Sequence, residues 1–300
     1  MRLYIYYMFI LLLVHANVGR AEEHSLPLDH DNVHWSRLIY AASAFFMTLE
    51  SEVRQESVTT EKASTQLVLN DEKDVHKSSA ENIVRIDNFS EGFGKKAHYT
   101  LWFDQNGEAL QRKKLVKGKR NEIKIYRFSS CGYFTLRKKF SSENFDENFK
   151  QWGEAKKSYT DFSSDLCGKQ PVYDVNALLY LISALNIKEV GYQRELTTFS
   201  DGKLLRVKIV AKKMTSIYGD FIINSPQKEQ TVNDSIDVLE LHLVPVTSSK
   251  KERESFRFLG LKGNIKVYLD LTHQLIVRLR GNVDVVGNLD INLKKAELLH

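Results

Sequence analysis

The chain has 300 residues, of which 42% are hydrophobic and 27% charged, and this composition excludes an intrinsically disordered protein. Four prolines and 15 glycines exclude the collagen-like and low-complexity classes. The 43 basic residues exceed the 38 acidic residues by only five charges, so we expect no nucleic-acid partner.

The first 21 residues have the pattern of a secretory signal peptide. Arg2 supplies a positive charge, residues 3–14 are apolar, and Gly19-Arg20-Ala21 places small residues at the cleavage site. The apolar run is shorter than the roughly 20 residues that a transmembrane helix needs. We therefore predict an exported, periplasmic protein that spans no membrane after cleavage, with an uncleaved anchor as the alternative.

Residues 22–36 are polar, and we interpret them as an extended, mobile N-terminal tail. His30 and His34 stand four residues apart in it, downstream of His24. Two histidines at that spacing can share a metal ion on a helix, but no helical pattern surrounds them, so we predict no metal site. Residues 37–300 show no change of composition and predict a single β-rich domain.

Apolar and polar residues alternate with period two along this domain, which predicts antiparallel strands with one buried and one solvated face. Asp201-Gly202 is a strong hairpin signal. Asp104–Gly107 begins like a calcium loop, but Leu115 stands at the twelfth position, so we interpret it as a hairpin turn. The clearest strands are predicted at residues 99–103, 190–199, 205–211, 239–243, 265–269, 275–279 and 289–293.

Residues 175–185 break the alternation because VNALLYLISAL is apolar on nearly every side. Asp174 stands at the N-cap position, and Asn186 can end the helix. A helix that is apolar all round must be buried, so we expect a strongly curved antiparallel sheet or half-open barrel wrapped around it. The helix residues predicted to line a cavity for a hydrophobic ligand are Leu178, Leu179 and Ile182.

Cys131 and Cys167 are the only cysteines, and an exported protein is expected to join them in a disulfide. Closing a loop of that size would stabilise the fold by about 3–4 kcal/mol in the chain-entropy model. The alternative, a catalytic thiol, has no sequence signature around either residue.

The segments VYDVNALLYLISAL (172–185) and VYLDLTHQLIVRL (267–279), with the Asp-Gly hairpin between them, resemble a family of uncharacterised exported bacterial proteins. This is a domain of unknown function expected in the periplasm of Gram-negative cells. The resemblance covers residue 172 to the C-terminus and implies a β-rich half-barrel or barrel with a helix after the first strands. It implies no catalytic residues, and Ile276 stands where the family often has proline.

A basic hairpin is the most suggestive surface feature, with Gly118 at its expected tip. Such a patch could bind an anionic envelope polymer, or its lysines could simply keep a solvated edge from aggregating. Lys117, Lys119 and Arg120 are the candidate binding residues. The full set of cations is Arg112, Lys113, Lys114, Lys117, Lys119, Arg120, Lys124 and Arg127.

No motif identifies a reaction. A hydrolase would need Glu240, His242 and Asp290 to converge on one pocket, and we keep this as a remote alternative. The sequence favours a non-enzymatic envelope protein that binds a hydrophobic or lipid-like ligand or an envelope partner, without a cofactor. Docking of the basic hairpin on an anionic envelope polymer is the alternative.

Overall fold

The computed structural model describes residues 26–44, 47–68, 75–92, 94–118, 121–140, 155–284 and 286–299. The predicted signal peptide at residues 1–21, His24, Lys119 and Arg120 lie outside these ranges.

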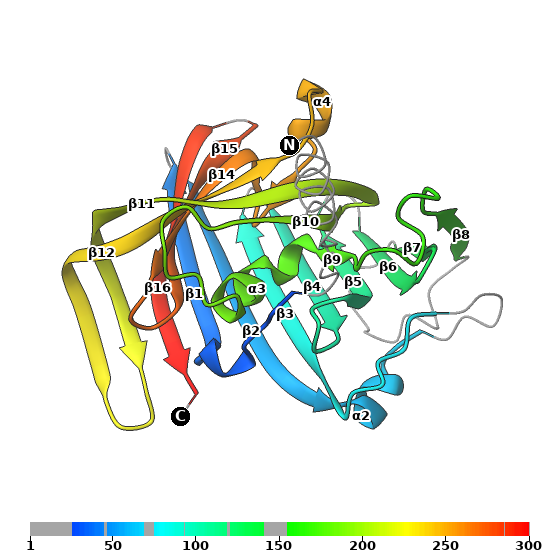
Figure 1. Ribbon diagram of the computed structural model, residues 1–300, viewed down its shortest axis with the longest axis horizontal. Helices are drawn as coiled ribbons and strands as arrows, with labels where there is room; N and C mark the ends of the chain where they lie inside the picture. Colours follow the sequence, from blue (N-terminus) through cyan, green and yellow to red (C-terminus); the bar gives the residue numbers. More distant parts are fainter. Residues whose placement is uncertain are drawn as a thin grey trace, which may run out of the picture.

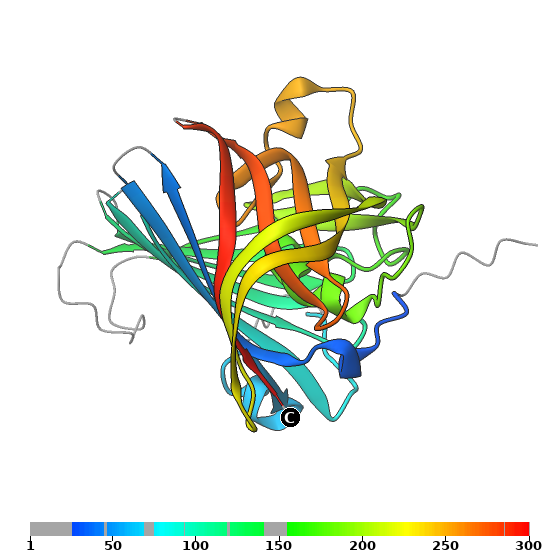
Figure 2. The same ribbon diagram turned by 90° about the vertical axis from the view of Figure 1, so that its left-hand side faces the viewer.

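The described strands form one large, curved, mixed β-sheet (Figure 1). Its strand order is β8-β7-β6-β5-β4-β3-β2-β1-β16-β15-β14-β12-β11-β10-β9, and β13 pairs with β14 off this path. Figure 2 shows the curvature from the side, with the blue-to-cyan strands on one side and the orange-to-red strands on the other.

Strands β1 to β8 make up what we call the first arm of the sheet. Each strand of this arm pairs antiparallel with the next. The bounds are β1 Trp35–Ala44, β2 Met47–Thr59, β3 Asn82–Gly92, β4 Lys95–Phe103, β5 Ala109–Lys117, β6 Asn121–Ser129, β7 Gly132–Phe140 and β8 Lys156–Asp161.

Strands β9 to β16 make up the second arm, which joins the first through the antiparallel pair β1–β16. The bounds are β9 Tyr173–Asp174, β10 Gln193–Ser200, β11 Lys203–Asn224, β12 Glu229–Pro245, β13 Arg257–Phe258, β14 Leu261–Asp270, β15 Leu275–Val283 and β16 Gly287–Leu298. The short helices are η2 His30–Asn32, α2 Thr60–Ser64, η4 Val175–Ala177, α3 Leu178–Ala184 and α4 Lys250–Arg253.

The predicted β-rich fold is confirmed, but the prediction of a purely antiparallel sheet is wrong at two pairings. β9 pairs parallel with β10, and the end of β11 pairs parallel with β16. The second pairing arises because β11 is 22 residues long and its residues 222–224 reach residues 295–297 of β16. The predicted hairpin at Asp201-Gly202 is confirmed, with φ angles of 46° and 89° that aspartate and glycine tolerate.

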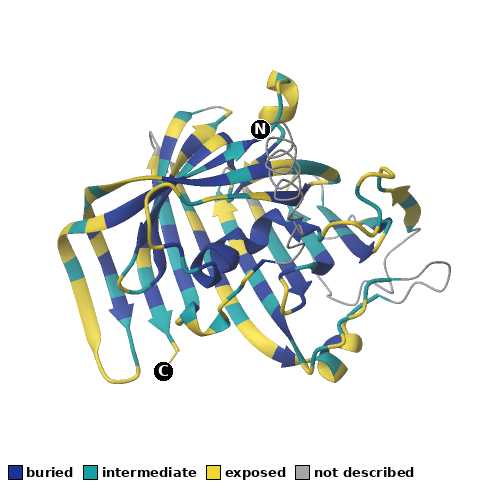
Figure 3. Ribbon diagram, in the orientation of Figure 1, coloured by how far each residue is buried: buried dark blue, intermediate teal, exposed yellow. Residues whose placement is uncertain are grey.

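The predicted helix consists of η4 followed by α3. The Asp174 carboxylate accepts a hydrogen bond from the backbone N–H of Asn176 at 2.8 Å, and Asn186, with φ 49°, follows the end of the helix. Every residue of η4 and α3 is buried (Figure 3). One hydrophobic cluster joins the apolar residues of η4 and α3 to side chains of both arms, such as Ile86 in β3 and Leu241 in β12. Among the described residues, no helix is both long and apolar enough to cross a membrane.

The described part of the N-terminal segment differs from the mobile polar tail that we expected for residues 22–36. Leu26, Val33 and Trp35 are 5%, 4% and 0% exposed, because they pack into the hydrophobic cluster that contains α3. The backbone N–H of Asp29 donates to the carbonyl oxygen of Ala184 at 2.8 Å, and β1 already begins at Trp35. Residues 26–36 are therefore part of the folded domain.

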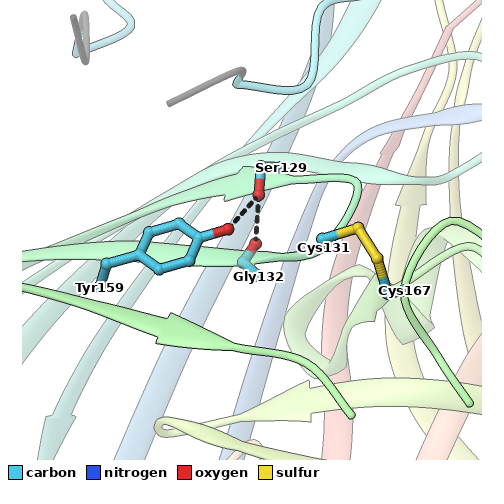
Figure 4. The surroundings of a disulfide bond; sticks show 5 residues. All are labelled: Ser129, Cys131, Gly132, Tyr159 and Cys167. Atoms are coloured by element: carbon cyan, nitrogen blue, oxygen red, sulfur yellow. Dashed lines mark hydrogen bonds between the residues drawn. A yellow bond between two sulfur atoms is a disulfide. The ribbon is translucent and has the colours of Figure 1, made fainter. Parts of the chain in front are cut away.

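The predicted disulfide joins Cys131 and Cys167 (Figure 4). Cys131 lies in the turn between β6 and β7, and Cys167 lies in the segment between β8 and β9. Beside it, the Tyr159 hydroxyl donates to Ser129 Oγ at 2.9 Å, and Ser129 Oγ donates to the carbonyl oxygen of Gly132 at 3.1 Å. The bond ties the chain that leads into β9 to the first arm.

Burial of α3 predicts a large effect of truncating its side chains. Leu178→Ala removes fully buried methyl groups and is expected to lower the free energy of unfolding by about 2–5 kcal/mol. The matched control Val190→Ala truncates a side chain that is 53% exposed and should change it by less than about 0.5 kcal/mol. Urea denaturation measures both, and equal small effects would show that the helix is loosely packed.

Candidate functional site

The three helix residues predicted to line a ligand cavity are fully buried. Leu178, Leu179 and Ile182 are 0%, 1% and 0% exposed. Five pockets with volumes from 160 to 860 Å³ open elsewhere among the described residues. None of these five is lined by the three helix side chains, so none provides the apolar cavity that the sequence led us to expect.

The basic hairpin forms from β5 and β6, but its described cations do not make one exposed patch. Alternate side chains of a strand lie on opposite faces of the sheet, so the run of charges is divided between the two faces. Arg112 and Arg127 are only 2% and 3% exposed, and Lys124 Nζ lies 3.5 Å from Glu122 Oε1. Lys117 lines a 540 Å³ groove together with three glutamates.

The residues considered for a hydrolase lie in a row of charge pairs. His242 Nε2 lies 2.6 Å from Glu240 Oε1, while Arg280 donates to both oxygens of Asp290 at 2.6 Å. Lys266 pairs in register with both His242 and Arg280, so the row crosses four strands. We interpret it as cross-strand charge pairing.

Both ring nitrogens of His30 form hydrogen bonds with other parts of the fold. The Tyr180 hydroxyl donates to Nδ1 at 2.6 Å, and Nε2 donates to the carbonyl oxygen of Gln105 at 2.8 Å, while His34 is exposed. His30 therefore links the N-terminal segment to α3 and to the turn after β4.

Arg112 of β5 is a charged residue that the fold buries almost completely, with an exposed fraction of 2%. Its guanidinium lies near the rings of Tyr99, Tyr126 and Phe199, with centroid distances of 5.2, 5.8 and 5.8 Å. Nη2 donates to Asp201 Oδ1 at 2.8 Å, and Nη1 lies 3.5 Å from Asp174 Oδ2. Arg112 thus connects the first arm to two aspartates of the second arm.

Local structure positions both aspartates. Asp174 is held as the N-cap of η4, where Oδ1 also accepts from the Asn176 side-chain amide at 2.8 Å. Asp201 occupies the left-handed position of the β10–β11 turn, so its side chain projects from the hairpin end. Lys114, two residues from Arg112, donates to Asp201 Oδ1 at 3.0 Å. Two cations and two carboxylates therefore form one network.

Burial and charge shift the pKa values of the two aspartates in opposite directions. Burial raises the pKa of Asp174, and Arg112 and the hydrogen bonds from Asn176 offset only part of this effect. Burial also opposes the charge of Asp201, but Arg112 and Lys114 outweigh it and lower the pKa of Asp201. Burial works against the charge on Arg112, but the two aspartates outweigh it and raise its pKa, so it stays protonated.

Arg112 and Asp201 line a cavity of 160 Å³ between the first arm and two hairpin turns of the second arm. The second turn is Leu259-Gly260, between β13 and β14, and both residues have positive φ angles. The wall combines the apolar side chains of Leu49, Val175 and Leu259 with hydroxyl and amide groups. The hydroxyl and amide groups come from Ser51, Asn88, Ser90, Tyr99, Asn176 and Ser200.

Arg112, which lines this cavity, and its partner Asp174 have unused hydrogen-bonding capacity. Nε and Nη1 of Arg112 and Oδ2 of Asp174 are buried, and no described protein group forms a hydrogen bond with any of them. Leaving such groups unpaired costs about 1–3 kcal/mol each, and more when they are charged. A polar ligand or water in the cavity would provide the missing partners for Arg112.

Sequence reasoning identified these residues but not their common site. Asp174 was interpreted as a helix cap, Asp201 as a turn residue and Arg112 as part of a surface patch. The alternation of Arg112 and Lys114 with Lys113 does indicate that the first two share a face. Their partners come from segments more than 60 residues away, and only the fold brings these together.

Comparison with protein-family models, curated proteins and solved structures finds no match for this chain. The resemblance of residues 172–300 to an exported bacterial family therefore stays a prediction.

The opposite pKa shifts predict opposite pH signatures for two conservative variants. Asp201 has a lowered pKa, so it stabilises the fold above its ordinary pKa of about 4 and loses this effect as pH falls through the lowered value. Asp201→Asn should therefore be destabilising at pH 7, with a deficit that shrinks below pH ~4.

Asp174 has a raised pKa, so its ionised form costs stability as pH rises from about 4 through the raised value. The stability of Asp174→Asn relative to wild type should therefore increase with pH over that range. Denaturation curves recorded from about pH 3 to about pH 8 would measure the free energy of unfolding of both variants. If the two variants changed in parallel with pH relative to wild type, the opposite pKa shifts would be contradicted.

Proposed function

We propose that this is a non-enzymatic binding protein that holds a small, uncharged, hydroxyl-rich ligand, such as a terminal sugar unit of an envelope glycan, in the cavity at Arg112. The observation that carries the proposal is a buried guanidinium at a cavity whose wall includes hydroxyl and amide groups. Two of its nitrogens make no hydrogen bond with the described residues.

The balance of charge favours an uncharged ligand over an anion. Arg112 and Lys114 are compensated by Asp174 and Asp201, and Arg257 at the cavity rim donates to Asp284 at 2.9 Å. An anion would have to displace one of these carboxylates. A hydroxyl group can accept from Arg112 and donate to a carboxylate or amide oxygen without adding charge.

Arg112 disfavours a purely apolar ligand. Covering Arg112 with hydrocarbon would leave its unbonded nitrogens without water, at a cost of several kcal/mol for a charged group. The lipid-like ligand considered from the sequence would also need space beside α3, where Leu178 and Ile182 are both 0% exposed.

The volume of the cavity and its opening to solvent suit a small ligand. The volume of 160 Å³ lies below the roughly 300 Å³ at which pockets for drug-sized molecules begin. The side chains of Asp201 and Arg257 are 46% and 45% exposed, whereas Ser51, Asn88 and Arg112 are buried. The cavity thus has a solvated rim and a buried polar floor.

Export to the periplasm is part of the proposal. It is supported by the Cys131–Cys167 disulfide, which is consistent with an oxidising compartment, and by the signal pattern of residues 1–21.

Ligand-observed saturation-transfer NMR on the full chain tests the proposal. The probes are glucose and N-acetylglucosamine as neutral sugars, glucuronate as their anionic counterpart and dodecanoate as an apolar ligand. We expect signals from at least one neutral sugar, and weaker or no signals from glucuronate and dodecanoate.

Ser51→Leu places a larger side chain in the cavity while leaving Arg112 itself unaltered, and it should abolish the sugar signals. The matched control is Ser57→Leu on the same strand, which alters an exposed residue and should leave the signals unchanged. Sugar binding that survives Ser51→Leu, or a preference for glucuronate or dodecanoate, would contradict the proposal.

A further inference from the structure

A second polar cluster lies where the β4–β5 turn meets the segment that precedes β3. It contains His76, Asp104 and Glu108, whose ligand atoms all lie within 4.8 Å of one another. His76 Nε2 is 3.3 Å from Glu108 Oε2 and 3.7 Å from Asp104 Oδ2. The cluster plays no part in the cavity at Arg112.

The backbone holds each of the three residues in place. The N–H of His76 donates to the carbonyl oxygen of Phe128 at 2.8 Å, and its carbonyl oxygen accepts from Arg127 Nη2 at 2.7 Å. Asp104 Oδ1 accepts from the backbone N–H groups of Asn106 and Glu108, both at 2.9 Å. Asp104 is thereby oriented with Oδ2 toward the histidine.

The turn itself is tightly packed. Gly107 has a φ of 79°, and a Cβ atom added there would lie 2.7 Å from a side-chain carbon of Leu181 in α3. The turn that carries Asp104 and Glu108 is therefore held against α3, as a preorganised metal site requires.

His76 Nε2 is buried and makes no hydrogen bond with any described group, although two carboxylate oxygens lie within 4 Å of it. In an ordinary ion pair the ring nitrogen would point at one of these oxygens. Here the nitrogen meets neither in hydrogen-bond geometry, which is the arrangement expected when all three atoms surround one point.

The spacing fits zinc. Ligands at about 2.1 Å from a tetrahedral zinc ion stand about 3.4 Å apart, close to the separations between His76 Nε2 and the two carboxylate oxygens. An imidazole nitrogen in the set favours zinc over calcium, which takes six to eight oxygen ligands. Three protein ligands leave one tetrahedral position for water.

We propose that His76, Asp104 and Glu108 form a zinc-binding site with one coordination position open to water. The ion would offset the charge of two adjacent carboxylates and fasten the segment before β3 to the β4–β5 turn.

The full chain, stripped with a chelator, is titrated with Zn²⁺ against a chromophoric zinc indicator, and its unfolding temperature is recorded with and without Zn²⁺. We expect one tightly bound equivalent and a higher unfolding temperature. His76→Gln and Glu108→Gln should each weaken binding at least about tenfold, since even the loss of outer-shell groups costs that much.

His273→Gln is the matched control, because His273 forms a plain pair with Asp270 at 2.7 Å and should leave the zinc affinity unchanged. Equal zinc binding by wild type and both site variants would overturn the proposal. So would the absence of binding, or a preference for Ca²⁺ over Zn²⁺. Glu108→Gln keeps the test decisive if His76→Gln does not fold.

Discussion

Beyond the β1–β16 pairing and the shared hydrophobic core, the two arms of the sheet meet at one buried charged contact, between Arg112 of the first arm and Asp174 and Asp201 of the second. Around it, Phe199 of the second arm packs between aromatic rings of β6 and β7, namely Tyr126, Phe128 and Tyr133. One backbone hydrogen bond, from Ala109 to Val172 at 2.9 Å, crosses the same gap. The contact fixes the spacing of the arms and therefore the shape of the cavity between them.

The proposed ligand would give this buried charge a role besides stability. A buried ion pair is often no more stabilising than apolar residues of the same volume, because both charges lose their hydration. A guanidinium also presents five fixed donors, and the aspartates use only part of this capacity. The aromatic rings around Arg112 complete the enclosure, so a ligand hydroxyl would meet donors that are already oriented.

Much of the fold could be predicted from the sequence, because period-two alternation marks parts of six strands of the second half and an all-apolar run marks the buried helix. The two-residue strands β9 and β13 are too short to show this alternation. The Asp-Gly turn, the Asp174 cap and the disulfide also follow from local chemistry. The parallel β11–β16 pairing could not be predicted, since it depends on the length of β11 and on a long-range contact. The site was missed for the same reason: Arg112, Asp174 and Asp201 each have a sufficient local explanation, and their meeting is set by the curvature of the sheet.

The β4–β5 hairpin links the two proposed sites. Glu108 belongs to the zinc cluster, Ala109 bonds to the segment that leads into Asp174, and Arg112 lies three residues further along β5. An ion bound at one end of this stretch would therefore steady the strand that carries Arg112. No displacement of the hairpin is required for either site.

The most direct test of the account is a double-mutant cycle between Arg112→Met and Asp201→Asn, measured by chemical denaturation. We predict a coupling free energy of about 1–3 kcal/mol, as for contacting residues that share one network. The reference is the same cycle at the exposed pair Arg280 and Asp290, where surface ion pairs contribute less than about 1 kcal/mol. A coupling between Arg112 and Asp201 no larger than that of the reference pair would contradict the claim that this contact joins the two arms.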